Sequence, residues 1–419
     1  MLKQILPVVS SILVLGSGFS YAQEAPDLEK RVQELELKLN AMESESRSAA
    51  FPELSGLGES FNGLGAGASK VYYVPAGVSI GGYGEAFYSH SDEKTDVADF
   101  LRAVIYVGYK FDDNWVLNTE FEFEHASTGE EGSVSVEFAT LDYLHSDALN
   151  GRVGMVLVPM GLINELHEPN TFYAVNRPST ETQLIPSTWR ENGFGLFGTV
   201  NETLQYRAYI VNGLDASGFT ESGLRGGRQK GSKAKAEDLA AVVRMDYVPS
   251  SDMLVGGSLY YGNSGQDLDV DVPTFIGEVH ADMTFQGLRF RALAALGMLD
   301  DVAELNRALA EPGTADADID SIGEEMFGWY LEAGYDLFIH RDADDEKALI
   351  PFVRYEELNV QEETPAGFAA SGKGNKDIVT FGINYLPLDE IVFKLDFARV
   401  ESGDGSDDEL INLSFGYVF

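Results

Sequence analysis

The stretch Leu410–Phe419, LINLSFGYVF, alternates large apolar side chains with small or polar ones. The large apolar face carries Ile411, Leu413, Phe415, Tyr417 and Phe419, and the opposite face carries Asn412, Ser414, Gly416 and Val418. A period of two residues is typical of a β-strand with two different surroundings. The apolar face needs explaining, because the chain is strongly acidic, with 68 Asp and Glu residues, 29 Lys and Arg residues and a formal net charge of -39.

The same alternation runs through most of the chain after Gly77, for example in FLRAVIYVGYKF (100–111), WVLNTEFEFEH (115–125) and FGWYLEAGYDLF (327–338). About sixteen such segments are predicted by the alternation. They begin near Gly77, Val97, Asn114, Gly132, Leu149, Gly193, Thr203, Glu237, Met253, Val272, Gly287, Glu325, Ala348, Lys376, Glu390 and Glu409. Short connections alternate with long polar ones, of which 160–192, 214–236 and 300–324 are the most extended.

An even number of strands, with short turns at one rim and long loops at the other, describes an outer-membrane β-barrel. In lipid every backbone polar group must be paired internally, so a membrane span built of strands has to close on itself. We therefore predict an all-β fold, a transmembrane antiparallel β-barrel over 77–419, closed by pairing the last strand with the first. A soluble β-sandwich or propeller would show the same alternation, with the apolar face in its core. The signal peptide described next, the alternating loop lengths and the aromatic last strand favour the barrel.

Residues 1–22 have the pattern of a secretory signal peptide. A short positive start, Met1-Leu2-Lys3, precedes an apolar segment, Ile5 to Phe19, and the small residues Ser20 and Ala22 mark a cleavage site. A membrane-anchor helix is the alternative, but this segment is short and interrupted by glycine. The expected location is the outer membrane of a Gram-negative bacterium, as an integral, multi-pass barrel.

Residues 23–50 predict a short periplasmic coiled-coil stalk. Its apolar seam has heptad spacing and consists of Leu28, Val32, Leu35, Leu39 and Met42. Because two heptads do not hold a coiled coil together alone, the alternative is a solvent-exposed amphipathic helix. Residues 51–76 are rich in Gly and Ser and are interpreted as a linker.

The composition argues against several classes of function. The acidic balance shows no footprint for nucleic acid, and the absence of cysteine excludes thiolate chemistry. The six histidines are scattered; only His167 has an acidic neighbour, Glu168. Asp316-x-Asp318-x-Asp320 begins like a calcium loop, but Ser321 and Phe327 stand where its Gly and Glu belong. We predict no catalytic residue, no metal ligand and no cofactor, and the chain is not expected to be an enzyme.

The inward face of the predicted strands is highly charged. Charged side chains belong in a wet lumen rather than against hydrocarbon, and a barrel of about 16 strands leaves a channel that its wall charges make selective. The predicted pore-lining residues are Arg102, Glu120, Glu122, Glu124, Arg152, Arg207, Arg244, Arg289, Arg291, Arg354, Lys394 and Asp396. The alternative role is structural, since pairs of opposite charge also brace a barrel wall.

The loop 160–192 is long enough to fold inward and narrow such a channel. Three prolines stiffen it, and its predicted constriction residues are Glu165, Glu168, Arg177, Glu181 and Arg190. An outer lid or a subunit latch is the alternative. A second loop, RGGRQKGSKAK (225–235), is the one basic cluster in the sequence. It is suited to attracting anions, or to pairing with acidic loops or lipopolysaccharide phosphates.

The chain resembles the phosphate-selective (O and P type) porins of Gram-negative outer membranes. The resemblance rests on GRVGMVLVPMG (151–161), NRPSTETQLIPSTWRENGFGLFG (176–198), PFVRYEEL (351–358) and FGINYLPLDEIVFKLDFA (381–398). It implies a 16-stranded trimeric porin with a ladder of wall arginines, for which Arg102, Arg152, Arg207, Arg244 and Arg354 are counterparts. The acidity of this chain departs from that pattern, because Glu120, Glu122 and Glu124 share the lumen and favour cations or zwitterions unless they lie at the mouths.

The predicted function is passive diffusion of small hydrophilic solutes or ions through a homotrimeric outer-membrane porin. The expected surroundings are outer-membrane lipid and lipopolysaccharide, with no nucleic acid partner. The alternative is a structural or surface-interaction barrel without a dedicated transport role. The sequence leaves the solute, and the choice between anions and cations, open.

Overall fold

The protein is described by a computed structural model that covers residues 60–126, 129, 132–340 and 347–419. The predicted signal peptide (1–22), the predicted stalk (23–50) and the first part of the predicted linker lie outside these residues. Among the helices of the described residues, none is long and apolar enough to cross a membrane.

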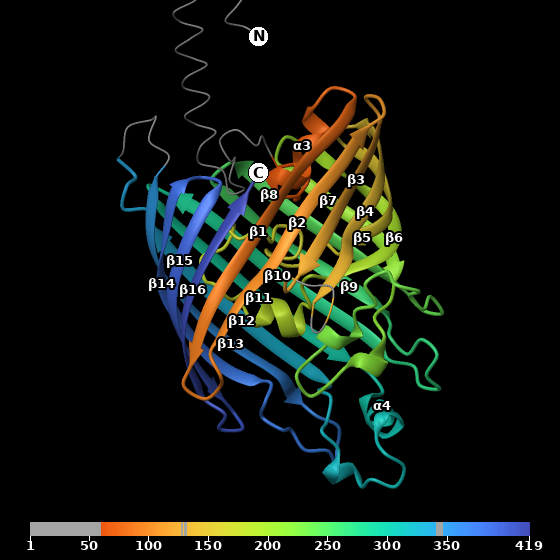
Figure 1. Ribbon diagram of the computed structural model, residues 1–419. Helices are drawn as coiled ribbons and strands as arrows, with labels where there is room; N and C mark the ends of the chain where they lie inside the picture. Colours follow the sequence, from red (N-terminus) through yellow and green to blue (C-terminus); the bar gives the residue numbers. More distant parts are fainter. Residues whose placement is uncertain (1–59, 127–128, 130–131, 341–346) are drawn as a thin grey trace, which may run out of the picture. The chain divides into compact units, whose positions relative to one another are not determined.

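The described chain forms a closed barrel of sixteen antiparallel strands, in which each strand pairs with its neighbours in sequence and β1 also pairs with β16 (Figure 1). The strands are β1 (Gly77–Ser91), β2 (Val97–Lys110), β3 (Trp115–Glu124), β4 (Ser133–Ser146), β5 (Leu149–Leu157), β6 (Arg190–Asn201), β7 (Leu204–Asn212), β8 (Leu239–Ser250), β9 (Met253–Asn263), β10 (Pro273–Phe285), β11 (Leu288–Leu299), β12 (Glu325–Tyr335), β13 (Ala348–Glu363), β14 (Asn375–Leu388), β15 (Ile391–Ser402) and β16 (Asp408–Val418).

This architecture confirms the predicted fold. The largest difference in a strand start is at β6, which begins at Arg190 rather than near Gly193. The predicted closure is also present, with Phe415 opposite Ala86 in the register of β16 and β1. Two backbone hydrogen bonds between Gly82 and Phe419, of 2.8 and 2.9 Å, continue this seam to the rim of short turns.

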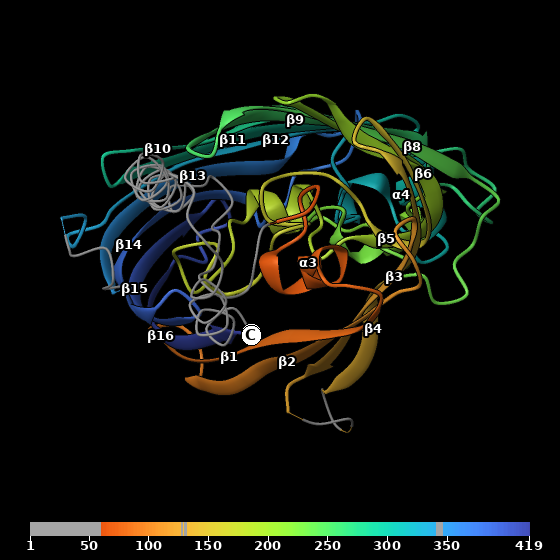
Figure 2. The same cartoon turned by 90° about the horizontal axis from the view of Figure 1, so that it is seen from above.

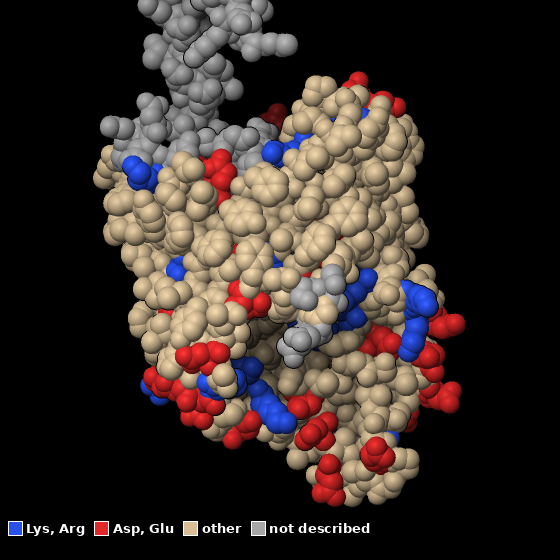
Figure 3. Space-filling model, viewed as in Figure 1, with Lys and Arg blue, Asp and Glu red and all other residues tan. Residues whose placement is uncertain are grey.

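The outer surface of the barrel is an apolar belt. Ile411, Leu413, Phe415 and Phe419, which the sequence analysis placed on one face, are exposed, whereas Asn412 on the other face is buried inside. Aromatic residues collect near the rim of short turns, where the rings of Trp115 and Tyr143 lie 4.8 Å apart. Figure 3 shows the belt as a nearly uncharged band across this face of the barrel. An apolar band bordered by aromatics matches the surface that outer-membrane barrels turn toward lipid.

The residues before β1 fold into the barrel interior, where the sequence analysis expected a linker. Helix α3 (Ala66–Tyr73) lies inside the ring of strands, against β1, β2 and β3 (Figure 2). It ends before Pro75, because the residue preceding a proline disfavours helical backbone. The helix can approach the wall closely because glycines of the wall have no side chain there. A Cβ on Gly81, for example, would lie only 2.9 Å from the Gly67 carbonyl oxygen. We call residues 60–76 the inner segment.

The chain between β5 and β6, residues 158–189, also folds into the lumen, and we call it the inner loop. Its two ends are joined by Asn164, whose side-chain amide donates to the carbonyl oxygens of Val158 (2.6 Å) and Trp189 (2.9 Å). The amide oxygen of Asn164 accepts from the Trp189 backbone N–H at 2.5 Å. A single helical turn, η2 (Thr180–Leu184), packs against β11, β12 and β13.

The opposite rim carries the other long loops, including the short helices η3 (Ala216–Gly218), η4 (Arg225–Gly227) and η5 (Asp316–Asp318). Helix α4 (Val302–Leu309) lies in the loop after β11, within the long polar connection 300–324 of the sequence analysis. It is amphipathic, with Val302 and Leu305 buried, and its Asn306 amide donates to the Ser321 hydroxyl at 3.0 Å. Eight residues are too short for a periodicity that stands out from the neighbouring strands.

Candidate functional site: the lumen and its two vestibules

Charged side chains of the wall hold the inner loop in place by bonding to its backbone. Lys394 on β15 donates to the carbonyl oxygens of Phe172 (2.9 Å) and Ala174 (3.1 Å). Asp396, two residues further along the same face, accepts from the Val175 N–H at 2.6 Å. Because the backbone groups of a buried loop have no water to bond with, these wall charges supply the partners they require.

The wall arginines from β8 to β13 act in the same way. Arg291 and Arg354 donate to the carbonyl oxygens of Thr171 (3.3 Å) and Asn176 (3.2 Å), and Arg244 donates to that of Gly161. Both Arg291 and Arg354 also face Glu332, at 3.6 and 3.7 Å. The arginines therefore join the wall to the inner loop and are not free for a passing solute in this arrangement.

Further predicted pore-lining residues pair along the wall itself. Arg102 bonds to Glu85 at 2.8 Å and faces Glu122 at 3.4 Å, and Arg289 bonds to Asp282 at 2.6 Å. Arg152 makes a bidentate pair with Asp142, at 2.8 and 2.9 Å, and a further bond to the Tyr72 hydroxyl of α3 at 3.2 Å. Glu124 lies at the outer end of β3 and accepts from the Ser133 hydroxyl at 2.7 Å.

All twelve predicted pore-lining residues thus lie on the inner face of the barrel, and ten of them are buried; Glu124 and Arg289 are half-buried. Seven of them hydrogen-bond to the inner loop or the inner segment, namely Arg152, Arg207, Arg244, Arg291, Arg354, Lys394 and Asp396. A cavity of about 10 Å³ between these two segments and the wall, lined by Arg244, Asp282 and Arg291 among others, has room for about one water molecule.

The predicted constriction residues contact different parts of this interior. Glu181 accepts from the Tyr330 hydroxyl (2.6 Å) and the Ile163 N–H (2.8 Å). Glu165 lies 3.4 Å from Arg207, and Glu168 accepts from the Tyr106 hydroxyl at 3.3 Å. The remaining two residues, Arg177 and Arg190, donate to the His167 carbonyl oxygen (3.5 Å) and to Glu137 (2.8 Å).

The first of two buried histidines belongs to a group of charges on neighbouring strands, which we call the wall cluster: Asp246, Glu278 and His280 with Arg207 and Arg244. The Nε2 atom of His280 lies 2.9 Å from Asp246, and its Nδ1 atom lies 2.8 Å from Glu278. Asp246 also accepts from Arg207 (2.7 Å) and Arg244 (2.8 Å). The cluster bridges β8 and β10 across Gly256 of β9, where a Cβ would lie 2.2 Å from the Asp246 carboxylate.

The second buried histidine, His167, connects the inner loop with the wall. Its Nε2 atom lies 3.1 Å from Glu137 on β4 and 3.5 Å from Glu120 on β3. Its Nδ1 atom lies 3.0 Å from the Asn164 carbonyl oxygen. We call Glu120, Glu137 and His167 the loop cluster.

Two larger cavities open at the rims. The outer vestibule, about 570 Å³ at the rim of long loops, is lined by Glu124, Ser133, Val134, Ser135, Val136, Met155, Thr188, Arg190, Arg225, Arg228, Lys230, Gly231 and Ser232. Four of these residues are cationic and one is acidic. Figure 3 shows a hollow below the apolar belt on this face, with Lys and Arg side chains at its edge.

Arg225 and Arg228 of the outer vestibule bond to backbone groups and have no carboxylate partner among the described residues. Arg225 bonds to the carbonyl oxygens of Thr182 and Ser187, and Arg228 bonds to that of Thr188 at 2.8 Å. Within the described chain, neither guanidinium has an Asp or Glu oxygen within the 4 Å of an ion pair. Burial, and after it repulsion from neighbouring arginines, lowers the pKa of both guanidinium groups.

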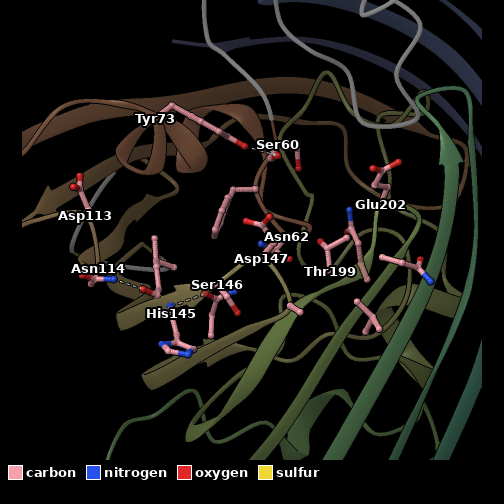
Figure 4. A pocket seen from close by; sticks show the side chains of 17 residues that line it. Ser60, Asn62, Tyr73, Asp113, Asn114, His145, Ser146, Asp147, Thr199 and Glu202 are labelled. Carbon is pink, nitrogen blue, oxygen red and sulfur yellow. Dashed lines mark hydrogen bonds between the residues drawn. The ribbon is translucent and has the colours of Figure 1, made fainter.

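The inner vestibule, about 770 Å³ at the rim of short turns, has the opposite character (Figure 4). The charged residues among its lining are Asp113, Asp147 and Glu202, with no Lys or Arg. The inner segment forms one side of this cavity, where the Tyr73 hydroxyl donates to the Ser60 carbonyl oxygen at 3.0 Å. The charged residues that line the two cavities are therefore mostly cationic in the outer vestibule and acidic in the inner vestibule.

The predicted site sets left out some of the residues that organise this interior. The basic composition of the loop 225–235 indicated that its cations are functional. The sequence could not show that they line the same cavity as Arg190. Glu137 is on the predicted inner face of its strand, but nothing marked it as a partner of His167. His280 stands two residues after Glu278, a spacing that places both on one face of a strand.

Comparisons with known proteins agree with this architecture. No family model matches the chain. Among solved structures, the outer membrane channel DcaP of Acinetobacter baumannii aligns with a TM-score of 0.55 and 14% identity, over 82% of this chain and 98% of that one. An anion-selective porin from Comamonas acidovorans aligns at 0.54 and 8% identity, over 82% and 100%. The trimer form of OmpT, an outer membrane protein of Vibrio cholerae, aligns at 0.53 and 12%, over 83% and 100%.

The closed 16-stranded barrel with its apolar belt therefore has the porin fold, and the chain is an integral outer-membrane β-barrel. An uncharacterized protein of Aquifex aeolicus (strain VF5) is 35% identical over 368 residues, which cover 86% of this chain and 84% of that protein. The chain belongs to the same family as this Aquifex protein.

Proposed function

We propose that the protein is a channel for small hydrophilic solutes, and that anions are its preferred cargo at the outer mouth. The observation that carries this proposal is the outer vestibule, where Arg225 and Arg228 have no carboxylate partner among the described residues, although the chain has a net charge of -39. This cavity places a concentration of positive charge at the rim of long loops. Field focusing by such a mouth raises the local concentration of anions.

The buried acidic residues do not argue against an anion preference. Glu122, Asp142, Asp246, Asp282 and Glu332 each lie within 4 Å of a wall arginine. Paired charges cancel at a distance, so these five carboxylates add little to the field that a solute meets. The resemblance to phosphate-selective porins supports an oxyanion such as phosphate as the solute, since guanidinium groups bind phosphate through two parallel hydrogen bonds.

The inner loop and the inner segment both pack against the inner wall between the vestibules, so we expect them to narrow the path of a solute. The many bonds that join them to the wall also favour the second candidate, a structural or surface-interaction barrel without a transport role. Single-channel recording of the purified full-length protein in a planar bilayer separates the two. Discrete open conductance supports the channel, and its absence at every applied voltage supports the structural barrel.

The anion preference is tested by the reversal potential in a KCl gradient. The double variant Arg225→Gln/Arg228→Gln is expected to lower the chloride-to-potassium permeability ratio by at least about twofold in 0.1 M salt, where charges act over about 10 Å. The effect shrinks in 1 M salt, where this range falls to about 3 Å. Arg307→Gln is the matched control, since Arg307 is exposed on α4, pairs with Asp316 at 2.7 Å and lies outside the vestibule.

An unchanged permeability ratio in the double variant would reject the vestibule as the source of selectivity. A wild-type channel that prefers potassium would reject anion cargo altogether. Adding phosphate to a chloride bath then tests the solute, because a phosphate channel loses chloride current when phosphate occupies its path.

We also propose that the protein functions as a homotrimer, as the trimer form of the Vibrio OmpT structure suggests for this fold. Sedimentation analysis in detergent measures the assembly directly, and a monomeric mass would reject this proposal.

A further inference from the structure

We infer that the loop cluster is a binding site for a divalent transition-metal cation such as Zn²⁺, and that the bound ion fastens the inner loop to the barrel wall. The cluster brings together three side chains from three separate parts of the chain: Glu120 on β3, Glu137 on β4 and His167 on the inner loop. One ligand atom from each lies within 4.8 Å of the others, and all three side chains are buried.

The two distances from the histidine to the carboxylates are close to those around a tetrahedral ion. Ligand atoms that surround Zn²⁺ tetrahedrally at about 2.0–2.2 Å lie about 3.3–3.6 Å from one another. The Nε2 atom of His167 is 3.1 Å from the Glu137 oxygen and 3.5 Å from the Glu120 oxygen. The set of one imidazole and two carboxylates also occurs in protein zinc sites, and it leaves the fourth position for water or a solute.

The histidine is oriented as a ligand. Its Nδ1 atom lies 3.0 Å from the Asn164 carbonyl oxygen, which can only accept a hydrogen bond, so Nδ1 carries a proton. The Nε2 atom is thereby directed at the two carboxylates. A histidine whose far nitrogen donates to a carbonyl oxygen is the usual arrangement around a protein-bound metal.

The carboxylates are partly held and partly unsatisfied. The second oxygen of Glu137 accepts from Arg190 at 2.8 Å, which fixes that carboxylate from behind. Glu120 is 0% exposed, and its Oε2 atom has no hydrogen-bond partner among the described residues. A buried carboxylate oxygen without a partner is costly, and a cation bound beside it would remove that cost.

A further carboxylate near the site adds negative charge that favours a bound cation. Glu168 of the inner loop is also buried nearby, with one oxygen bonded to the Tyr106 hydroxyl at 3.3 Å and the other without a partner in the described chain. The hydroxyl of Tyr83 on β1 lies 3.2 Å from Glu120. Arg190, which bonds to Glu137, also lines the outer vestibule, so the site lies one side chain away from that cavity.

The wall cluster does not offer such a site, although it also holds a histidine between two carboxylates. There the two carboxylates approach opposite nitrogens of the His280 ring, and Arg244 lies 3.0 Å from Nε2. No single ion can contact both carboxylates and a ring nitrogen in that arrangement. His280→Gln is therefore a matched control for His167→Gln.

The test measures Zn²⁺ binding to the detergent-purified full-length protein by equilibrium dialysis and elemental analysis. The wild type and His280→Gln are expected to bind one more tight equivalent per chain than His167→Gln and Glu137→Gln. Loss of a ligand is expected to weaken binding by more than the about 10- to 100-fold that loss of an outer-shell partner causes. Equal numbers of tight equivalents in the wild type and His167→Gln would overturn the proposal.

Co²⁺ gives a second readout that needs no variant. A site with three protein ligands converts Co²⁺ from its octahedral aqueous form to a four- or five-coordinate form with much stronger visible absorption. A spectrum identical to that of free Co²⁺ at saturating protein would overturn the proposal even if the variants fail to fold. Neither measurement depends on channel activity, so a failure here is distinguishable from a failure of the proposed function.

Discussion

His280 and His167 are both buried between carboxylates inside the same barrel, but their surroundings differ in two respects. In the wall cluster every residue comes from a strand, and each ring nitrogen of His280 faces its own carboxylate. In the loop cluster the histidine comes from the inner loop, and a single ring nitrogen faces both carboxylates. Similar residue types therefore produce a closed network in one place and a convergent ligand set in the other.

The difference shows what each cluster depends on. The register of β7, β8, β9 and β10 fixes the wall cluster as soon as the barrel forms, because its members project from three of these four consecutive strands. The loop cluster forms only when the inner loop enters the lumen and brings His167 to the wall. We therefore expect damage to the wall cluster to weaken the barrel, and damage to the loop cluster to weaken mainly the attachment of the inner loop.

The largest expected effect comes from Asp246→Asn. This change leaves Arg207, Arg244 and His280 around a neutral group, and breaking a buried ion pair in this way costs about 3–5 kcal/mol. Equilibrium unfolding by guanidinium in lipid vesicles measures the change in the free energy of unfolding. The counterpart Glu137→Gln is expected to cost less, since Arg190 keeps a bond to the Ser135 hydroxyl at 3.0 Å beside the outer vestibule. Equal losses in the two variants would contradict the distinction between the clusters.

An intermediate effect is expected from metal. If Zn²⁺ binds only the folded protein, free Zn²⁺ at about 100 times its dissociation constant raises the free energy of unfolding by about 2.7 kcal/mol. The wild type and His280→Gln should both show this gain, and a chelator should abolish it. His167→Gln should unfold at the same denaturant concentration with Zn²⁺ and with chelator. A gain in His167→Gln equal to that of the wild type would place the ion elsewhere.

The smallest expected effect comes from removing one hydroxyl from each cluster. Tyr83→Phe removes the hydroxyl beside Glu120, and Ser258→Ala removes the donor to Glu278. Each is expected to lower the free energy of unfolding by about 1–2 kcal/mol in metal-free buffer. This range lies between the usual contributions of a neutral hydrogen bond and of a hydrogen bond to a charged group. With Zn²⁺ present, the cost of Tyr83→Phe should fall, because the ion compensates Glu120, whereas the cost of Ser258→Ala should stay the same. Denaturant unfolding curves with and without Zn²⁺ measure both costs. If Zn²⁺ changed the two costs by the same amount, the proposed difference between the clusters would be wrong.

The strands could be predicted from the sequence because lipid and lumen impose a strict alternation on every one of them. Phe415 and Asn412 lie on opposite faces of β16, and because side chains alternate along a strand, their positions in the sequence predict this. The outward belt, the strand starts and the seam between β16 and β1 all follow from this local rule.

The interior could be predicted only in part. Inward charges such as Lys394 and Asp396 were identified, but their partners are backbone groups of the inner loop more than 200 positions away. The acidic neighbour of His167 in the sequence, Glu168, bonds instead to Tyr106, whereas the carboxylates that His167 meets come from two strands. Contacts of this kind depend on how a loop packs in three dimensions, and no local pattern records them.

The inner segment was missed for a related reason. Its Gly and Ser content suggested a linker, and the segment itself gives no sign of the groove into which it fits. That groove is made by wall glycines such as Gly81 and Gly108, where a Cβ on Gly108 would lie 2.6 Å from the Val71 side chain. The complementarity between a small-residue helix and a glycine-lined wall becomes visible only when the strands are closed.

The way the inner segment is attached has a mechanical consequence. Asn118, Lys110 and Arg207 donate to the carbonyl oxygens of Ala68, Tyr72 and Asn62, and the Tyr72 hydroxyl donates to Asp142 and accepts from Arg152. None of these bonds belongs to the ladder between strands. A pulling force applied upstream of residue 60 would therefore load these side-chain bonds and the apolar packing of the segment before it loads the cooperative sheet. We expect the segment to leave the lumen before the sixteen strands separate.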